Sequence, residues 1–267
     1  MTDPQRHDRQ PESVDGSLFV LEDATADQPG AEVSRAALAE SNARGAASWG
    51  AQHYSEAADL LQRVVDECRA TLGTHDPDTL VAEGNLAVTY ASLGRPDRGL
   101  DLLSRNVASR ERVLGPSHPR TLTARYAIGV IHFNADRFPE ALGVFAGVVA
   151  QRSRALGPAH PDTLAARVAL AAARAAVGDL AEARTILLSA LEDAEQSVGT
   201  LDLSTIRIRV DLGDCYAALG DLYLAHVEFD RAAADCETVL GSDHPYTVEL
   251  KSYVDEVVLE MAESPDF

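Results

Sequence analysis

The chain has 267 residues, of which 46% are hydrophobic but only 5% aromatic, so its core must be built mainly from Ala, Leu and Val. Its formal net charge is −19, and Lys251 is the only lysine among its 23 basic residues. An acidic surface of this kind argues against nonspecific binding of DNA, RNA or anionic membranes and favours cationic partners. No apolar run reaches the about 18 residues of a membrane span and no apolar signal core is present, so we expect a cytoplasmic protein.

The three cysteines, Cys68, Cys215 and Cys236, show neither the CxxC motif nor the spacing of a metal site. We therefore expect them to be buried and reduced, as is usual in a cytosolic protein. No metal and no cofactor is predicted.

Residues 1–31 are polar and acidic, contain Pro4, Pro11 and Pro29, and are predicted to be disordered. One apolar cluster interrupts this segment, followed at once by two acidic residues; its members include Leu18, Phe19 and Leu21.

A nine-residue motif, Leu-Gly-Pro-Ser-His-Pro-Arg-Thr-Leu, begins at Leu114 and returns along the chain at a fixed spacing of 42 residues. The repeated glycines are Gly73, Gly115, Gly157, Gly199 and Gly241. A fixed period of this size is the signature of a solenoid. The fold class predicted here is therefore all-α: a right-handed α-solenoid of about five helix hairpins with a C-terminal capping helix.

Each copy of the motif is expected to end one helix and begin the next. Its glycine suits the left-handed conformation just beyond a helix end, and its proline suits the first turn of the following helix. Asp76 and Asp202 stand where a helix cap is needed, and His118, His160 and His244 occupy the same slot. Equivalent positions of stacked repeats lie too far apart to share a metal ion, so we interpret these histidines as structural.

Between the motifs, small and large residues alternate at fixed offsets, as the packing of two helices into a hairpin requires. The small position holds Ala57, Gly99, Ala141, Ala183 and Ala225, and the large position four residues later holds Leu61, Leu103, Phe145, Leu187 and Phe229. The preceding helix repeats Leu86, Ile128, Leu170 and Leu212, each followed by Ala or Gly, with Tyr90 and Tyr216 three residues further on.

These positions resemble the tetratricopeptide repeat, and the 42-residue period with its LGxxHPxTL turn is similar to the kinesin-light-chain-like branch of that superfamily. The bias toward arginine favours a bacterial member from a GC-rich genome. The resemblance covers residues 33–263, with an atypical first pair. The expected solenoid spans residues 32–263, with pairs at about 33–71, 75–113, 117–155, 159–197 and 201–240, a cap helix at 244–263 and a tail at 264–267.

The resemblance implies that the first helix of each pair lines a concave groove for a protein or peptide partner. The family's Asn-Leu-Ala motif occurs once, at Asn85, and Ala127, Ala169 and Asp211 stand at the equivalent positions. Helical spacing around them gives the predicted groove: Val81, Asn85, Val88, Thr89, Thr123, Ala127, Val130, Ile131, Ala169, Ala173, Arg207, Asp211 and Asp214. An apolar middle with polar ends suits a short apolar or amphipathic segment.

Arg125, Arg167 and Arg209 share one repeat position and can either form a basic edge or pair with local acids. If they form an edge, the cluster at Leu18–Leu21 and the acids after it can dock on the groove of this or a neighbouring chain. The alternative is a disordered tail with a chance apolar cluster.

No GxxxxGK[ST], GxSxG, HExxH or paired CxxC motif is present, which argues against an enzyme. We therefore expect a non-catalytic adaptor or scaffold. Two alternatives stay open: a regulatory or biosynthetic accessory protein that binds a signalling or precursor peptide, and a self-associating structural protein, for example a homodimer.

Overall fold

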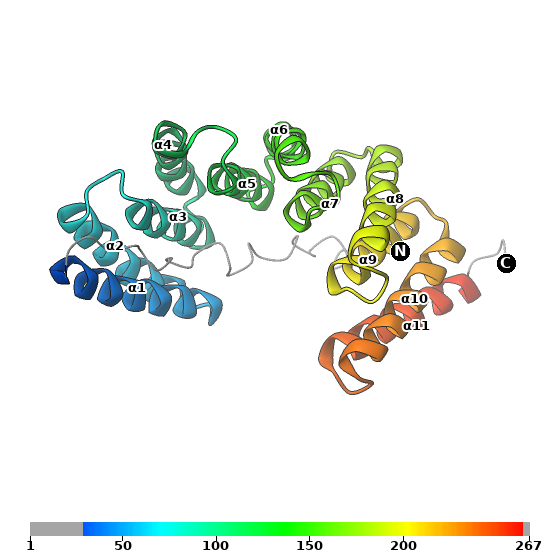
Figure 1. Cartoon of the computed structure of the whole chain (residues 1–267). Coiled ribbons are helices and arrows are strands. Elements are labelled where there is room, and N and C mark those ends of the chain that lie inside the picture. The colour runs from blue at the N-terminus through cyan, green and yellow to red at the C-terminus, as the bar shows by residue number, and fades with distance from the viewer. Residues whose placement is uncertain (1–28, 264–267) are drawn as a thin grey trace. The chain divides into compact units, whose positions relative to one another are not determined.

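The computed structural model describes residues 29–263, with side chains from residue 35 onward. Within that range the chain is entirely helical, which confirms the predicted fold class (Figure 1). The helices are α1 (Pro29–Gly50), α2 (Tyr54–Thr71), α3 (Pro77–Ser92), α4 (Pro96–Leu114), α5 (Pro119–Asn134), α6 (Phe138–Leu156), α7 (Pro161–Ala176), α8 (Leu180–Ser197), α9 (Leu203–Ala218), α10 (Leu222–Leu240) and α11 (Pro245–Glu263).

Odd-numbered helices are called A helices below and even-numbered ones B helices. Consecutive helices pack against each other from α1 to α5 and again from α7 to α11, as expected for a solenoid of helix pairs. The A helices from the second pair onward begin at Pro77, Pro119, Pro161, Leu203 and Pro245, which keeps the period of 42 residues. Helix α1 begins at Pro29, inside the segment expected to be disordered; the rest of that segment and the tail at 264–267 lie outside the described residues.

The repeated motif is the turn from each B helix to the next A helix, and it works as the sequence predicts. All five of its glycines have positive φ, between 93° and 96°, where a side chain would be strained. The capping slot is filled by side-chain acceptors: Asp202 Oδ1 accepts from the N–H of Ser204 at 2.8 Å, and His118 Nδ1 accepts from the N–H of Arg120 at 3.2 Å. His160 and His244 accept equivalent bonds at 3.2 Å. The histidines are therefore helix caps.

The threonine of the motif closes the same turn from the other side. Thr79, Thr121 and Thr205 donate their hydroxyl groups to the carbonyl oxygen of the motif's glycine at 2.8–2.9 Å. All three threonines are buried. Three of the turns are thus fixed by backbone conformation, a cap and a buried hydrogen bond.

The turn inside each pair follows the same period with a second set of positive φ values. Gly94, Gly178 and Gly220 supply them in three pairs, but Gln52 and Asp136 stand at the equivalent places with φ of 61° and 57°. The left-handed conformation disfavours residues with a Cβ, so these two turns are the strained copies.

Contacts divide the chain into two units, residues 1–144 and 145–267, and helix α6 contains the boundary. In unit 1 one apolar cluster joins α1, α2 and α3, and a second joins α3, α4 and α5. The small positions allow close approach: a Cβ on Gly99 of α4 would lie 2.5 Å from the carbonyl oxygen of Ala87 in α3. This contact is the hairpin packing that the alternation of small and large residues predicts.

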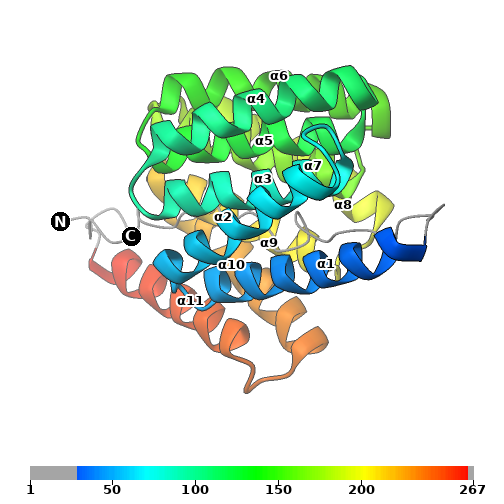
Figure 2. The same ribbon diagram turned by 90° about the vertical axis from the view of Figure 1, so that its left-hand side faces the viewer.

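Unit 2 has one continuous apolar cluster that runs from α7 to α11. Leu187 and Phe229 occupy the predicted large position and are almost fully buried, and a Cβ on Gly213 would lie 2.7 Å from the Phe229 ring. Helix α11 joins the cluster through Leu250, Tyr253 and Val257, and it lies beside α10 in both ribbon views (Figure 2).

Candidate partner-binding groove

The predicted groove residues lie on the A helices of both units. Within unit 1, α3 contacts α1 and α5, and within unit 2, α7 contacts α9. Each unit therefore presents its own row of adjacent A helices, and the two rows are described separately.

In unit 1 the centre of the row is a pair of asparagine amides. Asn85 of α3 donates its Nδ2 group to Oδ1 of Asn42 in α1 at 2.9 Å, and both side chains are buried. Asn85 Oδ1 is buried and accepts no hydrogen bond within the described part of the chain. Buried acceptors are usually paired, so this atom is a candidate acceptor for a group from a partner. Asn42 was not predicted, because it stands one residue away from the 42-residue register of Asn85.

Four other predicted groove residues of unit 1 belong to its interior. Val88, Ala127 and Ile131 pack in the apolar cluster with residues of α4. Thr89 is buried and donates its hydroxyl to the backbone oxygen of Asn85 at 2.8 Å. These side chains hold α3 and α5 in place beneath the row and do not form its polar surface.

The remaining members of the unit 1 set differ in exposure. Val81 and Val130 are buried, whereas Thr123 is partly exposed. The polar character of this row therefore comes from the two asparagines together with Thr123.

In unit 2 the row combines an alanine face with charged side chains. Ala169 and Ala173 of α7 are buried, and Arg207, Asp211 and Asp214 of α9 are partly exposed. Arg207 Nε lies 3.9 Å from Asp211 Oδ2, one helical turn away. The charges of this row are therefore gathered on α9, as the sequence predicts.

The arginines of the expected basic edge lie between A and B helices. Arg125 is ion-paired with Glu111 of α4. Arg167 pairs with Asp193 of α8 at 2.5 Å, and Arg209 pairs with Glu228 of α10 at 3.2 Å. Arg167 and Arg209 are also buried. Carboxylates on the B helices thus offset their charge, and these arginines are not part of the groove proposed below.

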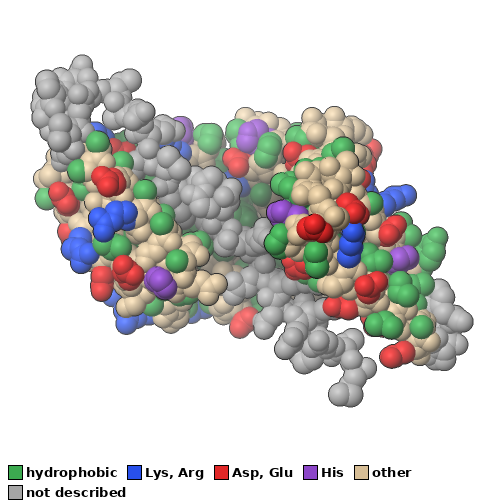
Figure 3. All heavy atoms as spheres, turned by 90° about the horizontal axis from the view of Figure 1, so that it is seen from below, with side chains coloured by type: hydrophobic (Ala, Val, Ile, Leu, Met, Phe, Trp, Pro, Cys, Tyr) green, Lys and Arg blue, Asp and Glu red, His purple; other side chains and the backbone are tan. Residues whose placement is uncertain are grey.

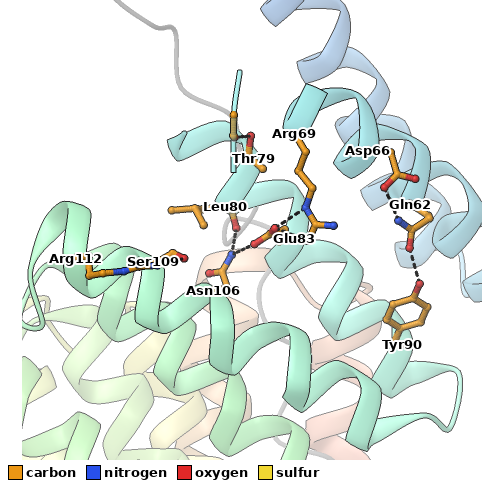
Figure 4. Close-up of polar contacts among 11 residues, drawn as sticks. Gln62, Asp66, Arg69, Thr79, Leu80, Glu83, Tyr90, Asn106, Ser109 and Arg112 are labelled. Carbon is orange, nitrogen blue, oxygen red and sulfur yellow. Dashed lines mark hydrogen bonds and ion pairs between the residues drawn. The ribbon is translucent and has the colours of Figure 1, made fainter. Parts of the chain in front are cut away.

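At the same repeat position of the second pair stands Glu83, the centre of a buried polar network (Figure 4). Its Oε1 accepts from Nε and Nη2 of Arg69 at 3.0 and 2.7 Å, and its Oε2 accepts from Nδ2 of Asn106 at 3.1 Å. Asn106 also donates to the Leu80 carbonyl oxygen at 2.7 Å and accepts from Nε of Arg110 at 2.7 Å. The network ties α2, α3 and α4 together and has a structural role.

Burial shifts the pKa of several titratable side chains. Burial raises the pKa of the Cys68 thiol to about 11 and raises the pKa of the Cys215 thiol, which keeps both protonated and unreactive. Burial lowers the pKa of His132 at the end of α5. Among residues 35–263 no group of three or more His, Cys, Asp or Glu side chains is arranged to hold a metal ion.

Acidic and basic side chains are interspersed on the face seen in Figure 3.

The apolar cluster at Leu18, Phe19 and Leu21 lies outside the described residues, so its docking stays a prediction. None of the helices between residues 29 and 263 combines the length and the hydropathy that a bilayer crossing requires.

Comparisons with known proteins agree with the repeat geometry. A kinesin light chain from Podospora anserina with nearly identical TPR-like repeats has a TM-score of 0.65 at 23% identity, over 80% of this chain and 99% of that one. BtubC (BKLC) from P. vanneervenii has a TM-score of 0.64 at 19% identity, over 81% of this chain and 84% of that one. A thermophilic TPR protein from Thermus thermophilus has a TM-score of 0.56 at 17% identity, over 83% and 99% of the two chains.

At these identities the likeness establishes the fold, which is that of kinesin-light-chain-like repeat structures. No curated protein matches the sequence. Sequence profiles described as tetratricopeptide repeat match residues 78–146, 126–196, 42–78 and 205–246. Proteins built from such repeats generally mediate protein–protein interaction as non-catalytic adaptors. The chain therefore belongs to the tetratricopeptide repeat family.

Proposed function

We propose that the protein is a non-catalytic adaptor in which the A helices bind a short peptide segment of a protein partner. Motifs for nucleotide, metal or nucleophilic chemistry are missing from the sequence, and burial raises the pKa of the Cys68 and Cys215 thiols. Helices held by fixed turns form a preorganised surface, so little ordering entropy is lost by the receptor when a peptide binds.

The observation that carries the proposal is the asparagine pair of unit 1. Asn42 fixes the orientation of the Asn85 amide by accepting from its Nδ2, which leaves Asn85 Oδ1 buried without a donor among residues 35–263. A peptide backbone offers N–H donors at regular intervals, and one such N–H would complete the hydrogen bonding of this oxygen. The pair thus suits recognition of peptide backbone rather than of one particular side chain.

The row of unit 2 has a selectivity of its own. On α7 the exposed Ala165 and the partly exposed Ala172 give it an apolar surface, and the partly exposed Asp211 and Asp214 of α9 supply negative charge. We expect a segment that binds to this row to be amphipathic, with apolar side chains near α7 and a polar or basic side chain near α9.

The experiment is a quantitative pull-down from a lysate of the source cells with the tagged full chain, in which captured proteins are identified by mass spectrometry. The test variant is Asn85→Ala with Asp211→Ala. The matched control is Asn134→Ala with Asp230→Ala, which makes the same chemical changes at the end of α5 and on the exposed side of α10.

We expect the test variant to lose a defined set of partners that the control variant retains. Thermal unfolding followed by circular dichroism must show that the test variant is folded at the pull-down temperature. If it is folded and retains every partner of the wild type, the groove is not the binding surface.

A further inference from the structure

Helix α11 presents an exposed apolar face that the repeat geometry marks as a helix-binding surface. Val248, Val258 and Leu259 are 55%, 46% and 65% exposed and lie within about a third of the helix circumference at 100° per residue. The opposite side of α11 is buried against α10 through Leu250 and Val257. This exposed set, with Asp255 between its members, is called the α11 outer face.

The other A helices show what normally covers this face. The positions equivalent to Val248 are Leu80, Leu122, Leu164 and Ile206, which are at most 2% exposed. In three of those repeats the A helix packs against its own B helix: α3 against α4, α7 against α8 and α9 against α10. Val248 of the α11 outer face therefore stands at a repeat position that is buried in the other A helices and exposed only in α11.

The charge of α11 determines what kind of helix would fit. At the position where the other A helices have Ala or Gly close to their B helix, α11 has Asp255. The helix carries five acidic residues, and its single lysine, Lys251, is paired with Glu237 of α10 at 2.8 Å. A carboxylate inside a helix–helix contact needs a cation opposite to it. A second copy of α11 would place acid against acid, which argues against self-association through this face.

From this face we infer a second binding surface, independent of the groove: the α11 outer face binds a basic amphipathic helix of a partner protein. The apolar side of that helix packs on Val248, Val258 and Leu259, and a lysine or arginine pairs with Asp255. Helix-in-groove recognition of this kind depends on apolar anchors three and four residues apart.

The test uses the full chain and fluorescence anisotropy at about 0.15 M salt, where nonspecific attraction between distant charges is screened. The probe is a labelled helical peptide of about 14 residues made only of Leu and Lys, with leucines at helical spacing. Its counterpart has Glu in place of Lys. The test variant is Val248→Ser with Leu259→Ser, which leaves the net charge of the protein unchanged.

The matched control is Val198→Ser with Leu201→Ser, two exposed apolar residues of unit 2 in the turn before α9. We expect the test variant to bind the Leu–Lys peptide about tenfold more weakly than the wild type, because apolar area is lost from the contact. We expect the control variant, and the groove variant Asn85→Ala with Asp211→Ala, to bind as the wild type does. Circular dichroism should show unchanged helicity, since all substituted positions of the test variant are exposed.

Four results would each overturn the inference: equal affinity of the test variant and the wild type, equal binding of the Leu–Glu peptide, loss of binding in the groove variant, or a dimer in sedimentation velocity that the test variant converts to monomer. The last result would identify a second copy as the occupant. Failure of this test leaves the pull-down with the groove variant unaffected, because the two surfaces share no residue.

Discussion

Replacing Glu83 with arginine should destabilise unit 1, and exchanging the charges of Glu83 and Arg69 together should recover part of the loss. The reasoning starts from a recurring ion pair between a B helix and the A helix fourteen residues later. In the second pair it is Arg69 with Glu83, but Glu111 with Arg125 and Glu195 with Arg209 have the opposite polarity. The repeat geometry thus accepts either polarity.

The magnitude follows from the contacts of Glu83. Arg69 is 39% exposed, so its pairing with Glu83 contributes only about 0.2–1 kcal/mol to the free energy of unfolding. The bond from the buried Asn106 to the carboxylate is worth about 1.5–3 kcal/mol. The single substitution loses both and brings a second cation close to Arg110, so we expect a loss of about 2–4 kcal/mol.

The double exchange, Arg69→Glu with Glu83→Arg, restores the ion pair but leaves Asn106 facing a donor. We therefore expect it to recover about 1 kcal/mol of the loss and not the whole. Urea unfolding should be followed by fluorescence of Trp49, the only tryptophan, which packs beside the apolar cluster of α3, α4 and α5 and donates to Ser92 at 2.9 Å. Its signal reports on unit 1 alone.

Circular dichroism measured in parallel reports on all helices, so a change confined to the fluorescence transition would locate the effect in unit 1. A matched control, Glu67→Arg, makes the same change at an exposed position of α2. The reasoning fails if Glu83→Arg costs no more than this control, or if the double exchange is no more stable than the single substitution.

Three further predictions concern packing, capping and burial. Gly99→Ala should lower the free energy of unfolding by about 1–3 kcal/mol, whereas Gly147→Ala, where a Cβ meets nothing within 4 Å, should raise it by about 0.5–1 kcal/mol; thermal unfolding distinguishes the two. His160→Ala should cost about 0.5–2 kcal/mol and His160→Asp should restore the cap, as urea unfolding would show. Because burial raises the pKa of Cys68 from 9.0 to about 11, the unfolded thiol ionises first, so stability should fall by up to about 2–3 kcal/mol between pH 9 and 11, and Cys68→Ala should remove this part of the pH dependence.

Those features of the fold that depend on local chemistry could be predicted from the sequence. The period of 42 residues located every turn between helix pairs, and the glycine and capping residues of these turns have the conformations that their chemistry requires. The small and large positions identified the hairpin contact, because two helices can pack closely where a small residue on one faces a large buried residue on the other.

The groove residues could be predicted only in part. Which side chains face the groove depends on the rotation of each helix about its own axis, and the sequence does not fix that rotation. Helical spacing cannot separate a residue that faces a groove from one that packs on the next helix a turn away. Helical spacing therefore predicts Val88 and Ile131 on the groove surface, although they pack with α4. Arg167 reaches Asp193, and Arg209 comes within 3.7 Å of Asp235 at the same offset along the chain. Sequence spacing brings such acids within reach, but it does not fix the direction in which a long arginine side chain points, and that direction decides between a pair and a basic edge.

The pair formed by Asn42 and Asn85 offers a way to separate stability from binding. Replacing Asn85 alone with leucine would leave the buried Asn42 amide without its donor, at a cost of about 1–3 kcal/mol. Replacing both with leucine removes the two buried amides together. This double change should cost less than the single one, because no amide of the pair then remains after losing the hydrogen bond between them. Binding should respond differently: both variants lack the amide oxygen, so both should lose the partners that the groove captures. Equal binding by the double variant and the wild type would show that the asparagines only join α1 to α3 and that a partner does not use them.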